Sequence, residues 1–227
     1  MRALLVALAA CSSSPGPAQV VPPAAPPTIE WDGSQVTTER LPAVSADGTT
    51  IVYAHERTGG GRGGHVPRLV LAGRDDRERD STQLATIDEV VDGTLGPADA
   101  KQRAEAARAW LAAHAPRVTP MTVLAVQRPD DGSQAHEATG DGFAIDWTPS
   151  HLAIRHGAEV LLDRATPPGW LVGPHKLCDS CEETCENPAH LAAAAIDLAH
   201  RVALVTLAFQ GSDTCWEPDA ATHVVAW

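Results

Sequence analysis

The sequence LPAVSADGTTIVYA, residues 41–54, decides the fold class that we expect for this chain. Two runs of apolar and β-branched residues, 41–44 and 50–54, flank a polar segment that contains Asp47 and Gly48. Glycine readily adopts the positive φ that a tight turn requires, and Asp-Gly between two such runs is a strong signal for a hairpin. The segment therefore predicts two antiparallel strands joined by a short turn.

Short strands are expected along most of the remaining sequence. Apolar and β-branched runs bounded by turn residues are found at 68–72, 82–87, 121–127, 143–147, 151–155 and 159–163. The last two flank His156-Gly157-Ala158 and predict a second hairpin. The alanine-rich residues 190–199 suit a helix, but together with residues 201–209 they also suit a hairpin, which we favour. Residues 222–227 then form a final strand.

One segment has the composition of a helix. Residues 97–114 are rich in alanine, arginine and glutamate, begin with Pro97 at a position that helices tolerate, and stop before Pro116. Their apolar side chains fall on one stripe: Ala100, Ala104, Ala107, Trp110 and Leu111. The expected fold is therefore α+β, with mostly antiparallel strands in hairpins and one helix packed on the sheet.

The N-terminus has the parts of a secretory signal. Arg2 supplies a positive charge, residues 3–10 are apolar, and small residues lead into Cys11. Eight apolar residues are too few to span a membrane as a helix, which needs roughly 20. The run Leu8-Ala9-Ala10-Cys11 resembles the lipobox of bacterial lipoproteins. The resemblance implies that residues 1–10 are a signal peptide and that Cys11 carries a diacylglyceryl group, whose two acyl chains give a stable anchor.

The residues that follow Cys11 divide into a tether and a domain. Residues 12–28 are rich in proline and poor in large apolar side chains, so they cannot bury enough surface to fold. In an extended state of about 3.1 Å per residue they would reach roughly 50 Å from the membrane. Residues 11–28 are thus the expected lipidated tether, and residues 29–227 have the length of a single globular domain.

The charge of the chain limits its partners. The formal net charge is −12, which disfavours phosphate backbones, so no nucleic-acid partner is expected. The order of lipobox, proline-rich tether and cysteine-bearing domain resembles uncharacterised lipoproteins of myxobacteria-like genomes. That resemblance implies a protein of the cell envelope, attached to a membrane by its N-terminal lipid. Ser12 after the lipidated cysteine indicates the outer membrane.

Residues 41–53 also resemble one repeat of the TolB-like, WD40-like propeller family, whose units combine proline, Ser-x-Asp-Gly and an apolar strand. A propeller needs at least about four blades of four strands. This chain is too short and too irregular for that, so the resemblance supports a hairpin only.

The cysteines form the most specific pattern of the expected domain. Cys178, Cys181 and Cys185 follow His175 closely, and Cys215 lies further along the chain. Four cysteines in an oxidising compartment favour two disulfides, each of which typically contributes about 2–4 kcal/mol to stability. The sequence does not choose the pairing. We therefore expect a disulfide-stapled C-terminal part.

Two other chemistries fit the same residues. Cys178, Cys181 and Cys185, with Cys215, His175 or His190 as the fourth ligand, could hold zinc tetrahedrally. The spacing Cys178-Asp179-Ser180-Cys181 is also that of thiol oxidoreductases, although the acidic residues nearby disfavour a thiolate. A metal-binding or thiol-redox envelope protein is thus the alternative to a disulfide-stapled binding protein.

Catalytic motifs are lacking in the sequence. There is no Gly-x-Ser-x-Gly elbow, and neither His55-Glu56 nor His136-Glu137 has the second histidine of a zinc protease helix. We therefore predict no catalytic residue and no cofactor. The expected role is non-enzymatic binding or surface structure in the envelope, with an envelope protein or a glycan as the partner.

Overall fold

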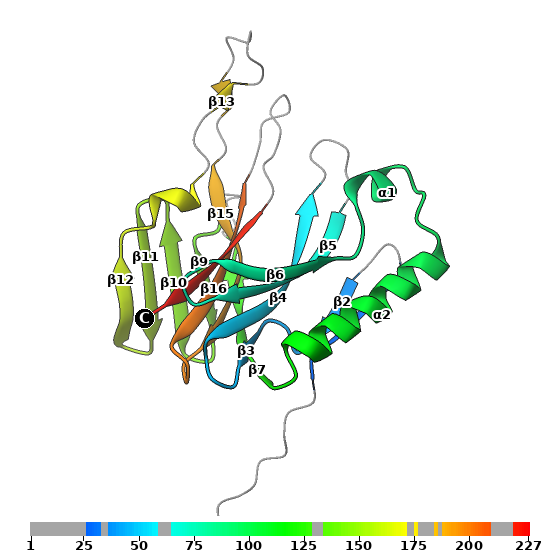
Figure 1. Cartoon of the computed structure of the whole chain (residues 1–227). Coiled ribbons are helices and arrows are strands. Elements are labelled where there is room, and N and C mark those ends of the chain that lie inside the picture. The colour runs from blue at the N-terminus through cyan, green and yellow to red at the C-terminus, as the bar shows by residue number, and fades with distance from the viewer. Residues whose placement is uncertain are drawn as a thin grey trace, which may run out of the picture.

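A computed structural model describes residues 26–32, 36–58, 65–128, 134–171, 175–176, 184–185, 188–209 and 220–227. Antiparallel strands dominate these residues and form two large sheets (Figure 1). Two ribbons of two strands accompany the sheets: β1 (Thr28–Trp31) with β2 (Val36–Glu39), and β13 (His175–Lys176) with β14 (Thr184–Cys185). Among the described residues, no helix combines the length and the apolar character that a membrane span requires.

The smaller sheet contains the hairpin that residues 41–54 predict. Its order is β6-β5-β4-β3-β7. The strands are β3 (Ala43–Ser45), β4 (Thr50–Thr58), β5 (His65–Gly73), β6 (Glu78–Gln83) and β7 (Val118–Pro120). Gly48 lies in the turn between β3 and β4 with a φ of 70°, so the predicted use of glycine at this turn is confirmed.

The larger sheet has the order β12-β11-β10-β9-β8-β15-β16-β17. Its strands are β8 (Thr122–Gln127), β9 (Glu137–Gly140), β10 (Phe143–Thr148), β11 (His151–His156), β12 (Glu159–Arg164), β15 (Ala189–Asp197), β16 (Val202–Phe209) and β17 (Ala221–Ala226). The predicted hairpin of residues 190–209 is confirmed as β15 and β16. In β12 the register shifts, which leaves Leu161 without a partner on β11.

Three apolar cores hold these layers together. One face of the larger sheet curls around a core that includes Trp147, Leu152 and Leu207. The opposite face, at β15 to β17, packs against the smaller sheet through Ile51, Leu204 and neighbouring side chains. The other face of the smaller sheet is covered by β1 and by α2 (Pro97–His114).

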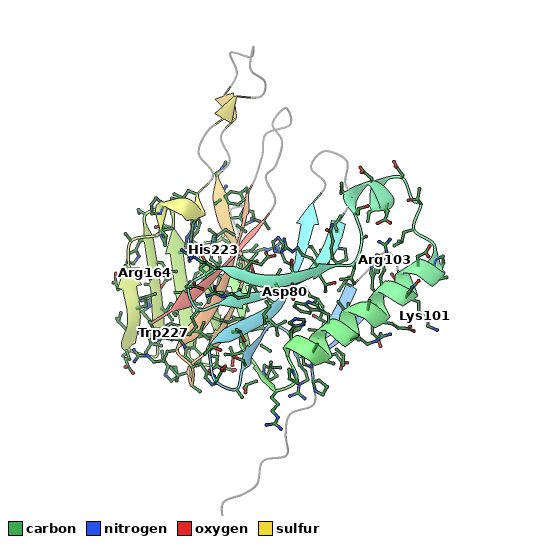
Figure 2. The ribbon with its side chains drawn as sticks, in the orientation of Figure 1. Asp80, Lys101, Arg103, Arg164, His223 and Trp227 are labelled. Atoms are coloured by element: carbon green, nitrogen blue, oxygen red, sulfur yellow. The ribbon has the colours of Figure 1, made fainter. Side chains whose placement is uncertain are left out.

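The helix α2 has the bounds that its composition predicts. Ala100, Ala104, Ala107 and Leu111 are buried against the smaller sheet. Trp110 is only partly buried; its indole Nε1 donates a hydrogen bond of 3.2 Å to Asp80, and its ring stacks on His114. Asp80 faces α2 from β6 in Figure 2.

The predicted α+β class, mostly antiparallel strands with one packed helix, is roughly compatible with the structure, although the described residues are mainly β and include a second, short helix, α1 (Ile87–Val91). Residues 82–87 were expected to be a strand, yet β6 ends at Gln83. The reason is a capping box, in which Thr86 accepts a hydrogen bond from Glu89 N and Glu89 accepts one from Thr86 N. This reciprocal pair starts a helix where the apolar pattern alone indicated a strand.

The predicted disulfide staple is also not found. No disulfide occurs among the described residues, where backbone pairing joins β15, β16 and β17. Cys178, Cys181 and Cys215 lie outside that part of the chain.

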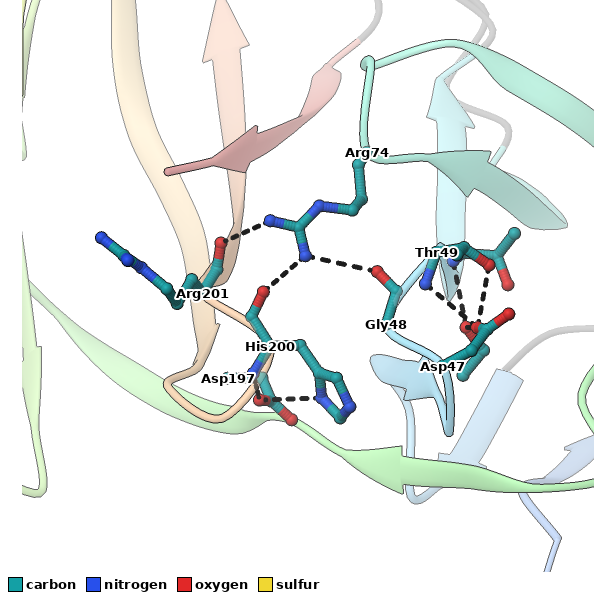
Figure 3. Close-up of polar contacts among 9 residues, drawn as sticks. Asp47, Gly48, Thr49, Arg74, Asp197, His200 and Arg201 are labelled. Atoms are coloured by element: carbon teal, nitrogen blue, oxygen red, sulfur yellow. Dashed lines mark hydrogen bonds and ion pairs between the residues drawn. The ribbon is translucent and has the colours of Figure 1, made fainter.

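Arg74 ties three turns together at one end of the two sheets (Figure 3). Its guanidinium donates to the carbonyl oxygens of His200 at 2.5 Å, Arg201 at 3.3 Å and Gly48 at 3.4 Å. Asp47, in the turn beside it, accepts hydrogen bonds from Ser45 and Thr49, which lower its pKa to about 2. These contacts fix how the β3–β4 and β15–β16 hairpins approach each other.

Candidate functional site

A groove of about 170 Å³ opens between the two sheets, and we call it the Tyr53 groove. Its walls come from the end of β2 and the segment before β3, from β4, and from β8, β15 and β16. The lining residues are mostly apolar: Thr38, Leu41, Pro42, Tyr53, Ala54, Val123, Ala193, Ala194, Ala195, Leu204 and Thr206.

The groove exists because the larger sheet is irregular at this point. β8 pairs with β15 only at residues 194–196, and the register of β15 against β16 shifts between Leu191 and Ala193. A bulge of this kind bends a strand and leaves a residue unpaired. Val123, opposite Ala195, is 64% exposed and is the most exposed large apolar side chain of the described residues.

Tyr53 is the one lining residue with a phenol group. The residue is 8% exposed, and no described residue makes a hydrogen bond to its hydroxyl. Burial raises its pKa to about 12; the charges of Asp76 and Glu78 act in the same direction, and Arg68 acts against them. Tyr53 is therefore a neutral phenol at physiological pH, and its hydroxyl can donate one hydrogen bond and accept others.

A chain of hydroxyl groups leads from the groove to a histidine. Thr206, which lines the groove, shares a hydrogen bond of 3.0 Å with Thr222 on β17. Thr222 in turn lies 3.2 Å from Nδ1 of His55, on β4. Residues 53 and 55 face the same side of β4, so the phenol and the imidazole both belong to the space between the sheets.

The turn between β5 and β6 holds β17 in place beside this chain. Asp76 accepts a hydrogen bond of 2.9 Å from Nδ1 of His223 and one of 2.6 Å from the backbone N–H of Val224. The His223 ring, labelled in Figure 2, stacks on Trp170 with centroids 4.2 Å apart. Thr222 is adjacent to His223, so these contacts also position its hydroxyl.

The groove suits binding of a small molecule. A dry apolar cavity of about 150 Å³ holds a benzene molecule, so a ring of six atoms with few substituents matches the available space. An apolar lining with a few placed polar groups is typical of ligand sites. Among the described residues there is no cluster of three or more histidine, cysteine or acidic side chains that could hold a metal.

The cysteine site predicted from the sequence falls largely outside the described residues. This applies to Cys11, Cys178, Cys181 and Cys215. Only the backbone of Cys185 is described, in β14, where it pairs directly with His175 of β13. The structure thus brings two of the candidate ligand positions into register and leaves the rest of the prediction untested.

Sequence reasoning did not find the residues of the Tyr53 groove. Thr206 and Thr222 carry no motif, and Tyr53 was part of a predicted strand without an assigned role. The only available signal was the alternation along β4, which places Tyr53 on the buried face with Ile51. Comparison with known proteins adds no assignment, because no family model, no curated protein and no solved structure matches this chain.

Proposed function

We propose that this chain is a lipid-anchored protein of the cell envelope that binds a small ligand in the Tyr53 groove without catalysing a reaction. The observation that carries the binding role is a mostly apolar groove lined by Tyr53, whose hydroxyl has no hydrogen-bond partner among the described residues. The Tyr53 hydroxyl is not among the fully buried polar atoms that lack a partner, so it is accessible to water, and a ligand with a hydrogen-bond acceptor could take the place of that water. The lining favours an apolar ligand over a glycan, the partner considered from the sequence.

Binding is tested with two probes of equal shape. Cyclohexanone carries one acceptor on a six-membered ring, and methylenecyclohexane replaces that oxygen by carbon. We expect cyclohexanone to shift the NMR signals of Val123 and Ala193 and to bind more tightly than the hydrocarbon. Tyr53→Phe should remove that preference. Equal binding of both probes by the wild-type protein would contradict the role of Tyr53.

A matched pair of variants tests the place of binding. Ala193→Phe puts a ring into the groove and should abolish binding of both probes. Ala192→Phe is the control, because Ala192 is exposed, precedes Ala193 and does not line the groove. Binding that survives Ala193→Phe would place the ligand elsewhere.

The anchor rests on Leu8-Ala9-Ala10-Cys11 and needs its own test. Expressed in a bacterium, the wild-type chain should incorporate labelled palmitate and sediment with membranes. Cys11→Ala should do neither. Sedimentation of the Cys11→Ala chain with membranes, without label, would overturn lipid anchoring.

The register of β13 and β14 favours one alternative. We propose as the second candidate a metal-binding or thiol-redox site, because His175 pairs with Cys185 and the sequence between them contains Cys178 and Cys181. Native mass spectrometry with and without a chelator tests it. Bound zinc that the chelator removes would support this candidate, and a metal-free chain purified in the presence of zinc would exclude metal binding.

A further inference from the structure

We infer that the ligand of the Tyr53 groove is a small apolar carboxylic acid, bound as its carboxylate, and that Arg40 at the rim of the groove is its charged anchor. This inference rests on the proposed function of the groove and names the ligand class. Thr38, two residues before Arg40, and Leu41, directly after it, both line the groove. Consecutive Cα atoms are about 3.8 Å apart, so the backbone of Arg40 belongs to the same wall.

The guanidinium of Arg40 has no partner in the part of the chain that the structure describes. Its Nε is buried and lacks a hydrogen bond there. The two terminal nitrogens are not among the fully buried atoms without a partner, and no described residue bonds to them, so they are accessible to water. The adjacent carboxylate of Glu39 accepts a hydrogen bond of 3.4 Å from Thr28 instead. A ligand can therefore reach an arginine whose charge no protein group balances.

The lack of a partner is notable because the chain has 29 acidic residues and only 17 basic ones. Other arginines of the two sheets and of α2 form ion pairs: Arg68 with Glu78, Arg79 with Asp75, Arg103 with Glu89 and Arg155 with Asp146. A partly buried charge without a partner costs free energy, and a bound anion offsets that cost. Arg40 also has a φ of 65°, a strained conformation that is found most often at binding sites.

The combination of an apolar wall and one guanidinium selects an anion with a hydrocarbon part. The groove of about 170 Å³ takes the hydrocarbon part, for which a ring of six atoms has a suitable size. The planar guanidinium matches the two oxygens of a carboxylate. A single arginine balances the one negative charge of a carboxylate, whereas a phosphate monoester carries nearly two.

Two probes that differ in charge test the ligand class. Cyclohexanecarboxylate and cyclohexanecarboxamide share a six-membered ring and a planar substituent, but only the first is an anion at about pH 7. Binding is measured by NMR titration of the Val123 and Ala193 signals. We expect the wild-type protein to bind the carboxylate about tenfold more tightly than the carboxamide, as for a hydrogen bond to a charged group. The Nε–H signal of Arg40 should shift with the carboxylate.

A matched pair of variants tests the anchor. Arg40→Gln removes the charge at the rim and should lower the affinity for the carboxylate about tenfold, while the affinity for the carboxamide stays the same. Arg164→Gln is the control, because it removes the same charge from an exposed position on β12, which is not a wall of the groove (Figure 2). It should change neither affinity. A urea titration establishes that each variant is folded.

A salt series on the wild-type protein gives the same answer without a variant. Raising the salt concentration from about 0.05 M to about 0.5 M screens exposed charges and should weaken binding of the carboxylate only. Binding of the carboxylate that does not respond to salt would contradict an ion pair with Arg40.

The remaining outcomes separate this inference from the proposed function. If the carboxylate and the carboxamide bind the wild-type protein equally, or if Arg40→Gln and Arg164→Gln weaken carboxylate binding equally, Arg40 is not the anchor. Binding of cyclohexanone would then leave the proposed function standing. If none of the probes shifts the signals of the groove, the proposed function fails and the inference falls with it.

Discussion

Asp76 holds His223 and the backbone of β17 with one carboxylate. One oxygen accepts from His223 Nδ1 at 2.9 Å, and the other accepts from Val224 N at 2.6 Å. Asp76 belongs to the turn of the β5–β6 hairpin, whereas His223 lies on the edge strand of the larger sheet. The contact therefore joins the two sheets at an edge that would otherwise be open.

Asp76→Ala should destabilise the protein by about 1–3 kcal/mol, because it leaves the buried N–H of Val224 without an acceptor. Asp76→Asn is the control: it keeps an oxygen acceptor and suits the positive φ of 61° at this position. The free energy of unfolding is measured by urea titration. If Asp76→Ala is as stable as Asp76→Asn, the carboxylate does not hold β17.

Gly48→Ala should destabilise the protein more than Gly157→Ala does. Both glycines have a positive φ, 70° and 55°. Alanine in this left-handed backbone conformation lowers the free energy of unfolding by about 1–2 kcal/mol in both variants. A Cβ at residue 48 would lie 2.6 Å from Cδ2 of His200, whereas a Cβ at residue 157 meets nothing within 4 Å. If both variants lower the melting temperature equally, the His200 side chain moves away from the added Cβ without a cost in stability.

Glu89 should make stability depend on pH in the acidic range. Hydrogen bonds from Arg103 and Thr86 lower its pKa from 4.5 to about 2. The folded state therefore binds this proton more weakly than the unfolded state, so the stabilisation is present above about pH 4.5 and is lost as the pH falls towards 2. Arg103 reaches Glu89 from α2, where it is labelled in Figure 2.

The free energy of unfolding of the wild-type protein is compared with that of Glu89→Gln at pH values from about 4.5 down to about 2. Glutamine keeps an acceptor for the capping box but does not titrate. We expect the difference between the two proteins to shrink as the pH falls. A constant difference would mean that Arg103 does not stabilise the charged form of Glu89.

Tyr53 should titrate far above an ordinary tyrosine. It is the single tyrosine of the chain, so the absorbance of tyrosinate reports this residue alone. Its pKa is raised from 10.0 to about 12, and the corresponding stability is present below pH 10 and lost as the pH rises through 12. The folded protein should show the high midpoint and the denatured protein the ordinary one; equal midpoints would contradict burial of the phenol.

Local sequence signals predicted the hairpins and α2 well because their causes are local. Gly48 provides the left-handed residue between β3 and β4, and Pro97 and Pro116 delimit the helix. The capping box of Thr86 and Glu89 was equally readable, but the apolar residues around it were interpreted as a strand. For this reason the start of α1 was expected to belong to a strand.

The groove could not be predicted in the same way. β8 and β15 pair although more than sixty residues separate them in the sequence, and no local pattern marks that pairing. The face of Tyr53 followed from alternation along the strand, but Thr206, which lines the groove with it, and Thr222, which contacts His55, come from β16 and β17. A site assembled from distant strands leaves no spacing motif to recognise.

The unpartnered Leu161 in β12 affects whether copies of this domain can pair with one another through their sheets. The larger sheet has two ends: β17, which the turn of Asp76 covers, and β12, whose ladder is interrupted at Leu161. A bulged end strand is a poor template for the strand of a neighbouring molecule. Chains concentrated on a surface would therefore stay separate instead of joining into a continuous intermolecular sheet.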